Sequence, residues 1–132
     1  MWTFDPGRVA NMRSRLKDLC SSIAELDVVP GSLTTAEAAE LVGDLSRACK
    51  QLSAVLSVVA VRAAEGNEWR RDADGSPADW MSRKTGRPVG QCKEELSAAE
   101  AVEVFPELKD AFLGGALSGS QTAAVVEVAK VD

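Results

Sequence analysis

The residues that could carry chemistry gather in one basic segment of the chain. Positions 83 to 93 hold four cations, one glutamine and no acid before Glu94. These residues are Arg83, Lys84, Arg87, Gln91 and Lys93. Arginine and lysine bind phosphate oxygens, and an arginine fork or a glutamine amide can also pair with a base edge. The segment predicts a DNA contact in which Arg83 and Lys84 hold the backbone, while Gln91 reaches adenine and Arg87 reaches guanine or phosphate.

The same segment has a plainer interpretation as a solvated helix face. A Gly-Arg-Pro turn between two helices is common, and a short cluster of cations often has no ligand. The whole chain carries 15 Lys and Arg against 20 Asp and Glu, a net charge of −5. Such a balance predicts no general attraction to nucleic acid or to an acidic membrane, yet it permits a local basic patch. Both interpretations stay open.

Catalysis by this chain is not expected. It has no histidine, which removes Ser-His and Cys-His nucleophile pairs and histidine-ligated metal centres. Cys20, Cys49 and Cys92 match no zinc spacing, and the acidic run from 94 to 110 lacks a calcium-loop pattern. We therefore expect no catalytic residue, no metal site and no cofactor.

The composition predicts a reduced, soluble, cytoplasmic protein without a membrane partner. An odd number of cysteines leaves at least one unpaired in any disulfide scheme, which favours a reducing compartment. The most apolar run, residues 54–64, is interrupted by Ser57 and Arg62 and is shorter than the roughly 20 residues of a membrane span.

Two long amphipathic helices are predicted ahead of the basic segment. Apolar residues recur at steps of three and four over 9–26, after an Asp5-Pro6 start. The same spacing returns over 38–63, after a capping box made by Thr34 and Glu37. The second helix should continue to Gly66 for about 30 residues, or on the order of 45 Å.

The apolar seam of the second helix is the predicted surface for pairing of helices. Its oligomerisation residues are Leu41, Leu45, Leu52, Val55 and Val59. A heptad-like seam of this length usually packs along another long helix. The two long helices could form an antiparallel hairpin within residues 1–66, or the seam could pair two copies of the chain as a homodimer.

Short helices should follow over residues 67–132. Turn and cap signals place them at 77–84, from about 90 to 102, at 106–113 and at 122–131. No alternating strand pattern occurs. We therefore expect an all-α fold: a long helical hairpin (1–66) followed by a co-folded bundle of short helices (67–132), with a helix-turn-helix-like unit at 76–103. The last helix has no stop signal, which suggests that the chain is the N-terminal part of a longer protein or ends on a frayed helix.

The second part of the chain resembles a known family. The run EWRRDADGSPADWMSRKTGRPVGQCKEELSAAEAVEVFPELKDAFLGGALSGSQTAAVVEVA, with the long helix before it, is similar to an actinobacterial and mycobacteriophage domain of unknown function found N-terminal to HNH endonuclease modules. The likeness covers residues 33–132. It implies a non-catalytic DNA-targeting or assembly module, whose parent protein carries a metal-dependent nuclease module after it.

A fainter likeness concerns the order of the short helices. A helix, a Thr-Gly turn, a helix and a Gly-x-Leu-Ser turn are similar in order to the DNA-binding core of ParB-type partition proteins. The likeness implies a DNA contact through the basic segment. Glu94 and Glu95 depart from the pattern, because carboxylates would repel phosphate and should point away from it. The alternative function is an oligomerisation or protein-interaction module without DNA affinity.

Overall fold

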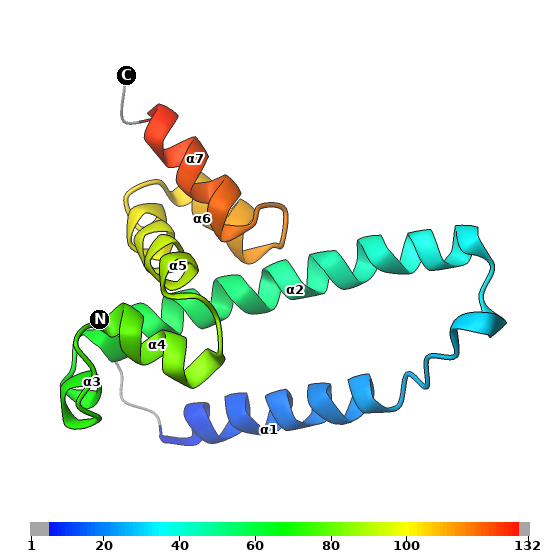
Figure 1. Cartoon of the computed structure of the whole chain (residues 1–132), viewed down its shortest axis with the longest axis horizontal. Helices are drawn as coiled ribbons and strands as arrows, with labels where there is room; N and C mark the ends of the chain where they lie inside the picture. The colour runs from blue at the N-terminus through cyan, green and yellow to red at the C-terminus, as the bar shows by residue number, and fades with distance from the viewer. Residues whose placement is uncertain (1–5, 130–132) are drawn as a thin grey trace. The chain divides into compact units, whose positions relative to one another are not determined.

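The computed structural model describes residues 6–129, which are helical throughout their regular parts and contain no strand. The elements in chain order are α1 (Pro6–Ala24), the 3-10 turn η1 (Pro30–Ser32), α2 (Thr35–Ala64), α3 (Glu68–Arg71), α4 (Pro77–Thr85), α5 (Val89–Val102), α6 (Pro106–Leu113) and α7 (Gly119–Ala129) (Figure 1). The all-α prediction is confirmed. The predicted cap at Asp5 and the predicted helix end at Val131 lie outside the described residues.

The chain divides into two compact units between Ala38 and Ala39, within α2. In the first unit, α1 ends at Ala24, and Asp27 takes a left-handed conformation with φ 46° before η1 begins. Every described side chain from 7 to 32 is exposed. The pairing of the two long helices into a hairpin stays a prediction.

The start of α2 is fixed by the predicted capping box. The Thr34 backbone N–H donates to Glu37 Oε1 at 2.9 Å, and the Glu37 backbone N–H donates to Thr34 Oγ1 at 3.1 Å. Each side chain thus satisfies an N–H that the first helical turn leaves free. The hydrogen bond from the Thr34 backbone lowers the pKa of the Glu37 carboxyl.

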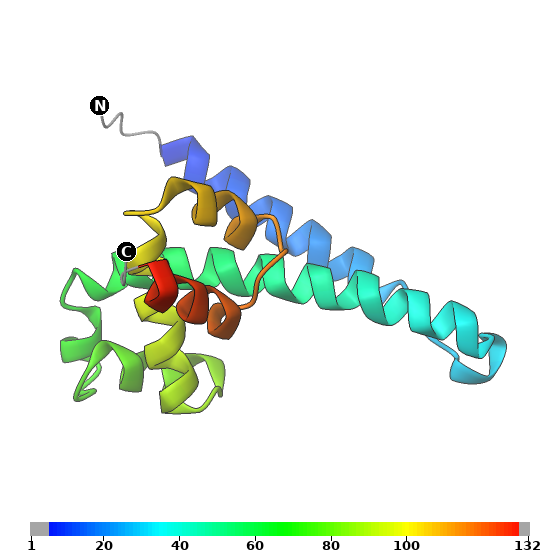
Figure 2. The ribbon, with the colours of Figure 1, turned by 90° about the horizontal axis from the view of Figure 1, so that it is seen from above.

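The core of the second unit lies where the short helices gather around the C-terminal half of α2 (Figure 2). One cluster contains Ala54 of α2, Ala99 and Val102 of α5, and Phe112 of α6. The other cluster joins Ala60 of α2 to α4 and α5, and its buried members are Ala60, Ala78, Met81 and Cys92. Both clusters include α2, so this half of the long helix is part of the bundle's core.

Small residues let the short helices approach α2 closely. The buried residues of α2 are Ala54, Ser57 and Ala60, all with short side chains. On the facing turn, Gly115 has φ 80°, and a Cβ there would lie 2.8 Å from the Arg47 carbonyl oxygen. The turn between α6 and α7 can therefore touch α2 only because this residue is glycine.

Two short elements differ in part from the sequence prediction. α3 occupies a region in which we expected only a polar turn. The four residues 118–121 were predicted to cap the last helix, and Ser118 and Gln121 do form a capping box, but α7 begins at Gly119, three residues before the predicted start at Thr122. The Ser118 hydroxyl accepts from the Gln121 backbone N–H at 3.1 Å, which extends the helix toward its N-terminus.

Candidate functional site

The predicted helix-turn-helix-like segment consists of α4, a three-residue turn and α5. Ser76 caps α4 by accepting a hydrogen bond from the Asp79 backbone N–H at 3.1 Å. Gly86 ends the helix with φ 75°, a left-handed conformation that suits glycine. The Ser82 hydroxyl then donates to the Arg87 carbonyl at 2.6 Å. These contacts fix the turn on which the basic residues lie.

Arg83 and Lys84 point toward two carboxylates from the loop before α4. The Arg83 guanidinium lies 2.9 Å from Asp74 Oδ2 and 3.1 Å from Asp72 Oδ2. Lys84 Nζ lies 3.8 Å from the same Asp72 oxygen. Asp72 also accepts a hydrogen bond from the Trp80 indole N–H at 3.0 Å. Two predicted phosphate contacts are therefore already matched by carboxylates.

These contacts shift the ionisation of the groups. The hydrogen bond from Trp80 is the largest cause that lowers the pKa of Asp72, and Lys84 and Arg83 lower it further. The hydrogen bond to Asp74 raises the pKa of Arg83. Each shift favours the charged form of the group. A phosphate bound by Arg83 would have to compete with two ionised carboxylates.

Arg87 is directed into the bundle rather than away from it. Its Nη1 atom lies 2.7 Å from Glu95 Oε2 and 2.8 Å from Glu95 Oε1, and its Nη2 donates to Ser53 Oγ on α2 at 3.0 Å. The Gln91 amide donates to the same carboxylate at 3.1 Å. The Glu95 side chain is 7% exposed and that of Arg87 is 27% exposed. Arg87 therefore links the turn to α2 and neutralises a buried acid.

The structure thus separates the five predicted DNA-binding residues. Arg83 and Lys84 lie together at Asp72 and Asp74, whereas Arg87 and Gln91 lie together at Glu95. Lys93 is exposed on α5 and forms no ion pair among residues 6–129. The DNA contact through all five residues remains a prediction. Arg87 could take part only by leaving a buried partner.

Sequence reasoning missed the acids that occupy these cations. Asp72 and Asp74 lie in the polar turn before α4, and the left-handed Ala73 between them, with φ 62°, turns the chain there. Glu95 was expected to point away from DNA, and its burial against Arg87 is one way to do so. The sequence did carry a signal for the contact between Gln91 and Glu95. The two residues are four positions apart on α5 and therefore neighbours on the helix surface, next to the core pair Cys92 and Leu96.

Cys92 packs in the core and is not a reactive site. It is fully buried, and burial is the main cause that raises the pKa of its thiol. A raised pKa leaves less of the nucleophilic thiolate at neutral pH. The residue serves as a small apolar side chain beneath the turn.

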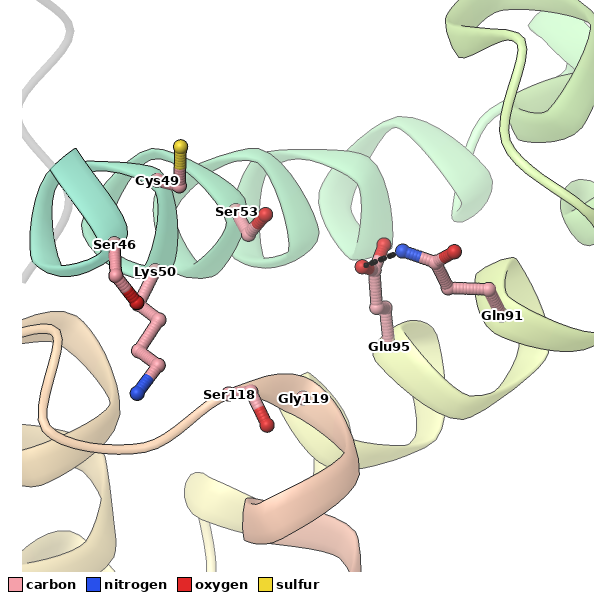
Figure 3. Close-up of a pocket in the computed structure, with 8 residues that line it drawn as sticks. All are labelled: Ser46, Cys49, Lys50, Ser53, Gln91, Glu95, Ser118 and Gly119. Atoms are coloured by element: carbon pink, nitrogen blue, oxygen red, sulfur yellow. Dashed lines mark hydrogen bonds between the residues drawn. The ribbon is translucent and has the colours of Figure 1, made fainter. Parts of the chain in front are cut away.

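A polar cavity of about 200 Å³ lies between α2, α5 and the start of α7 (Figure 3). Its lining residues are Ser46, Cys49, Lys50, Ser53, Gln91, Glu95, Ser118 and Gly119. Lys50 extends from α2 toward the turn before α7, while Cys49 points away from the cavity (Figure 3). Glu95 is held by Arg87 and Gln91, so the cavity presents hydroxyl groups and one ammonium and no activated nucleophile.

The predicted oligomerisation residues form an exposed apolar seam on α2. The exposed fractions run from 41% at Leu41 and Leu52 to 52% at Leu45 and Val59, with Val55 at 46%. At about 100° of rotation per residue, this seam faces roughly opposite to Ala54, Ser57 and Ala60. The α2 seam, defined by these five residues, therefore points away from the core of its own bundle.

The described residues offer neither a metal site nor a membrane span. Over residues 6–129, no three cysteine, aspartate or glutamate side chains gather in a group that could hold a metal ion. None of the helices in that range combines the length and apolar character needed to cross a bilayer.

The fold and site define a helical module with two long amphipathic helices and a compact bundle. Comparison with protein-family models, curated proteins and solved structures finds no match for this chain.

Proposed function

We propose that this chain is a non-catalytic assembly module that joins two copies through the α2 seam. The observation that carries this proposal is the exposure of five large apolar side chains at heptad-like positions, on the face of α2 opposite the core. Burying apolar surface stabilises association by about 25 cal/mol per Å² before the entropic cost of association is subtracted. A single copy would leave this seam in water unless its own α1 covered it.

The spacing of the α2 seam fits another helix in particular. Leu41, Leu45, Leu52, Val55 and Val59, together with Ala48, repeat every seven residues, as a and d positions of a coiled coil do. A seam of this kind is self-complementary, so the same face of a second copy can supply its partner. The core contacts of Ala54 and Ala60 need not change when this opposite face is covered.

The variant Leu45→Asp with Leu52→Asp tests the proposal by light scattering on the full chain. Charges in the seam should convert a dimer to a monomer while the circular dichroism of the bundle is kept. The matched control is Ala39→Asp with Ser46→Asp, which adds the same charges to α2 outside the seam. A seam variant that keeps the mass of the unmodified chain would refute the proposal.

The resemblance to nuclease-associated domains indicates what pairing of two copies would do. In a parent protein with an HNH module, pairing of two copies would bring two nuclease modules together. The divalent metal would belong to that module, because this chain contains no histidine.

DNA contact is the second candidate function, and the exposed cations near the turn favour it. Lys84 is 52% exposed on α4, and Lys93 is exposed at the start of α5. In helix-turn-helix proteins, the N-terminal residues of the second helix lie near bases and the turn lies near phosphates. The ion pairs of Arg83 and Arg87 predict weak binding that falls steeply with salt.

A mobility shift of labelled duplex at low salt tests this second candidate. Lys84→Ala with Lys93→Ala should weaken binding on every sequence, because phosphate contacts carry no sequence information. The control pair, Lys50→Ala with Lys109→Ala, removes two cations from other surfaces. The absence of any shift for the unmodified chain would eliminate DNA contact and leave the assembly proposal intact.

A further inference from the structure

The apolar stripe of α1 is a second surface that the proposed function does not use. Its residues and their exposed fractions are Val9 59%, Met12 47%, Leu16 51%, Leu19 40% and Ile23 50%. The first unit has no buried side chain between 7 and 32. In proteins, most of the stability of a helix comes from packing of its amphipathic face, so the 19-residue α1 should gain stability from an apolar surface outside residues 7–32.

Cations border this stripe on both sides. At about 100° per residue, Arg8 and Arg15 fall along one edge of the stripe, and Arg13 and Lys17 fall along the other. Asp18 is the single acid of the helix and lies on the opposite face among serines and an asparagine. Four cations against one acid give α1 a net charge of +3, and the loop after it adds Glu25 and Asp27, which lowers the net charge of residues 6–29 to +1.

We infer that α1 binds the surface of an anionic lipid bilayer, lying in its plane with the apolar stripe toward the acyl chains. The long side chains at the two edges can then reach the phosphates of the headgroups while their methylene stems stay in apolar surroundings. Each basic residue near such a surface adds attraction that an uncharged lipid does not provide.

Two features favour lipid over the other anionic partners. Nucleic acid would satisfy the cations but would offer little apolar surface for Leu16 or Ile23. Another helix, whether the α2 seam of this chain or a helix of a partner, would cover the stripe of α1 but not its continuation, since Leu26, Val28 and Val29 are 54–66% exposed where the chain is no longer helical. A lipid surface can cover both the helical and the irregular part.

This mode of binding requires no membrane span. The expectation of no membrane partner depended on the missing span and on the charge of the whole chain. Peripheral binding depends instead on the local charge and apolar area of one helix. The inference requires that the α2 seam of the same chain does not already cover the α1 stripe, since a hairpin of the two helices would remove the lipid-binding surface and the assembly surface together.

Flotation of the full chain with lipid vesicles tests the inference. We expect binding to vesicles of equal parts phosphatidylglycerol and phosphatidylcholine to be at least about tenfold stronger than to phosphatidylcholine alone. Arg8→Glu with Arg15→Glu should remove that preference. Leu16→Asp with Ile23→Asp should abolish binding to both vesicles.

The matched control is Arg70→Glu with Arg71→Glu, which reverses two cations on α3 and should leave flotation unchanged. Circular dichroism of each variant in buffer checks that the bundle stays folded. The inference is overturned if the unmodified chain does not float with anionic vesicles or floats equally with both compositions. It is also overturned if Leu16→Asp with Ile23→Asp lowers the molecular mass in lipid-free buffer while vesicles bind nothing, because a helix would then cover the stripe.

Discussion

At the scale of single residues, the basic segment shows that cations without an acid beside them in the sequence can still form ion pairs in the folded chain. Arg83, Lys84 and Arg87 carry no neighbouring acid along the chain, yet each reaches a carboxylate from another turn or from α5. Local charge counts identified the cations correctly. They could not identify the partners, because pairing across eight to twelve residues depends on how the loop before α4 turns and on which face of α5 is buried.

Glu95 gives the sharpest prediction at this scale. Glu95→Ala leaves Arg87 partly buried without its carboxylate, and loss of one partner from a buried ion pair costs about 3 kcal/mol of unfolding free energy. Urea denaturation followed by circular dichroism measures this loss. The neighbouring Glu94 is half-buried and takes part in none of the ion pairs found among residues 6–129, so Glu94→Ala should change stability by less than about 0.5 kcal/mol. Equal effects of the two variants would show that the Arg87–Glu95 pair does not stabilise the fold.

Asp72 predicts a dependence of stability on pH. Its pKa is lowered from an ordinary value of 3.8, so its ionised form stabilises the folded state above that pH. Acidification through the lowered pKa protonates the carboxylate and removes this stabilisation. We expect the urea midpoint of the unmodified chain to exceed that of Asp72→Asn at neutral pH. The difference between the two midpoints should shrink as the pH falls below 3.8. A difference in midpoint that stays constant with pH would contradict the role of ionised Asp72 in stability.

At the scale of elements, the sequence predicted helices well because their signals are local. The capping box at Thr34, the Ser76-Pro77 start of α4 and the glycine that ends α4 are each read from a few adjacent residues. α3 was missed since four residues are too short for a helical period to appear. Which face of α2 is buried was also beyond the pattern, because both faces carry apolar residues and only packing decides between them.

Two glycines of one compact unit should respond in opposite directions to alanine. Gly115→Ala places a Cβ 2.7 Å from the Gln51 side chain and forces φ 80° on an L-residue, and we expect a loss of about 2 kcal/mol. Gly43 lies inside α2 with no atom within 4 Å of its missing Cβ. Gly43→Ala should therefore stabilise by about 0.5–1 kcal/mol. Thermal unfolding of both variants checks the pair, and a stabilising Gly115→Ala would refute the close approach of its turn to α2.

At the scale of the whole molecule, the feature to be explained is the amount of apolar surface that residues 6–129 leave exposed. The α2 seam and the α1 stripe together expose ten large apolar side chains in regular spacing. Both sets could be predicted from the sequence, because three-four spacing of apolar residues is visible without knowing the fold. What covers each surface could not be read from periodicity, because a seam has the same pattern whichever surface it meets.

Sedimentation equilibrium of the unmodified full chain, in lipid-free buffer over a wide range of concentrations, tests the assembly proposal most directly. The chain has a mass of 14.0 kDa, and pairing through the α2 seam predicts a species of twice that mass, about 28 kDa, that dissociates on dilution. A constant mass of 14.0 kDa up to the highest concentration would contradict the proposal.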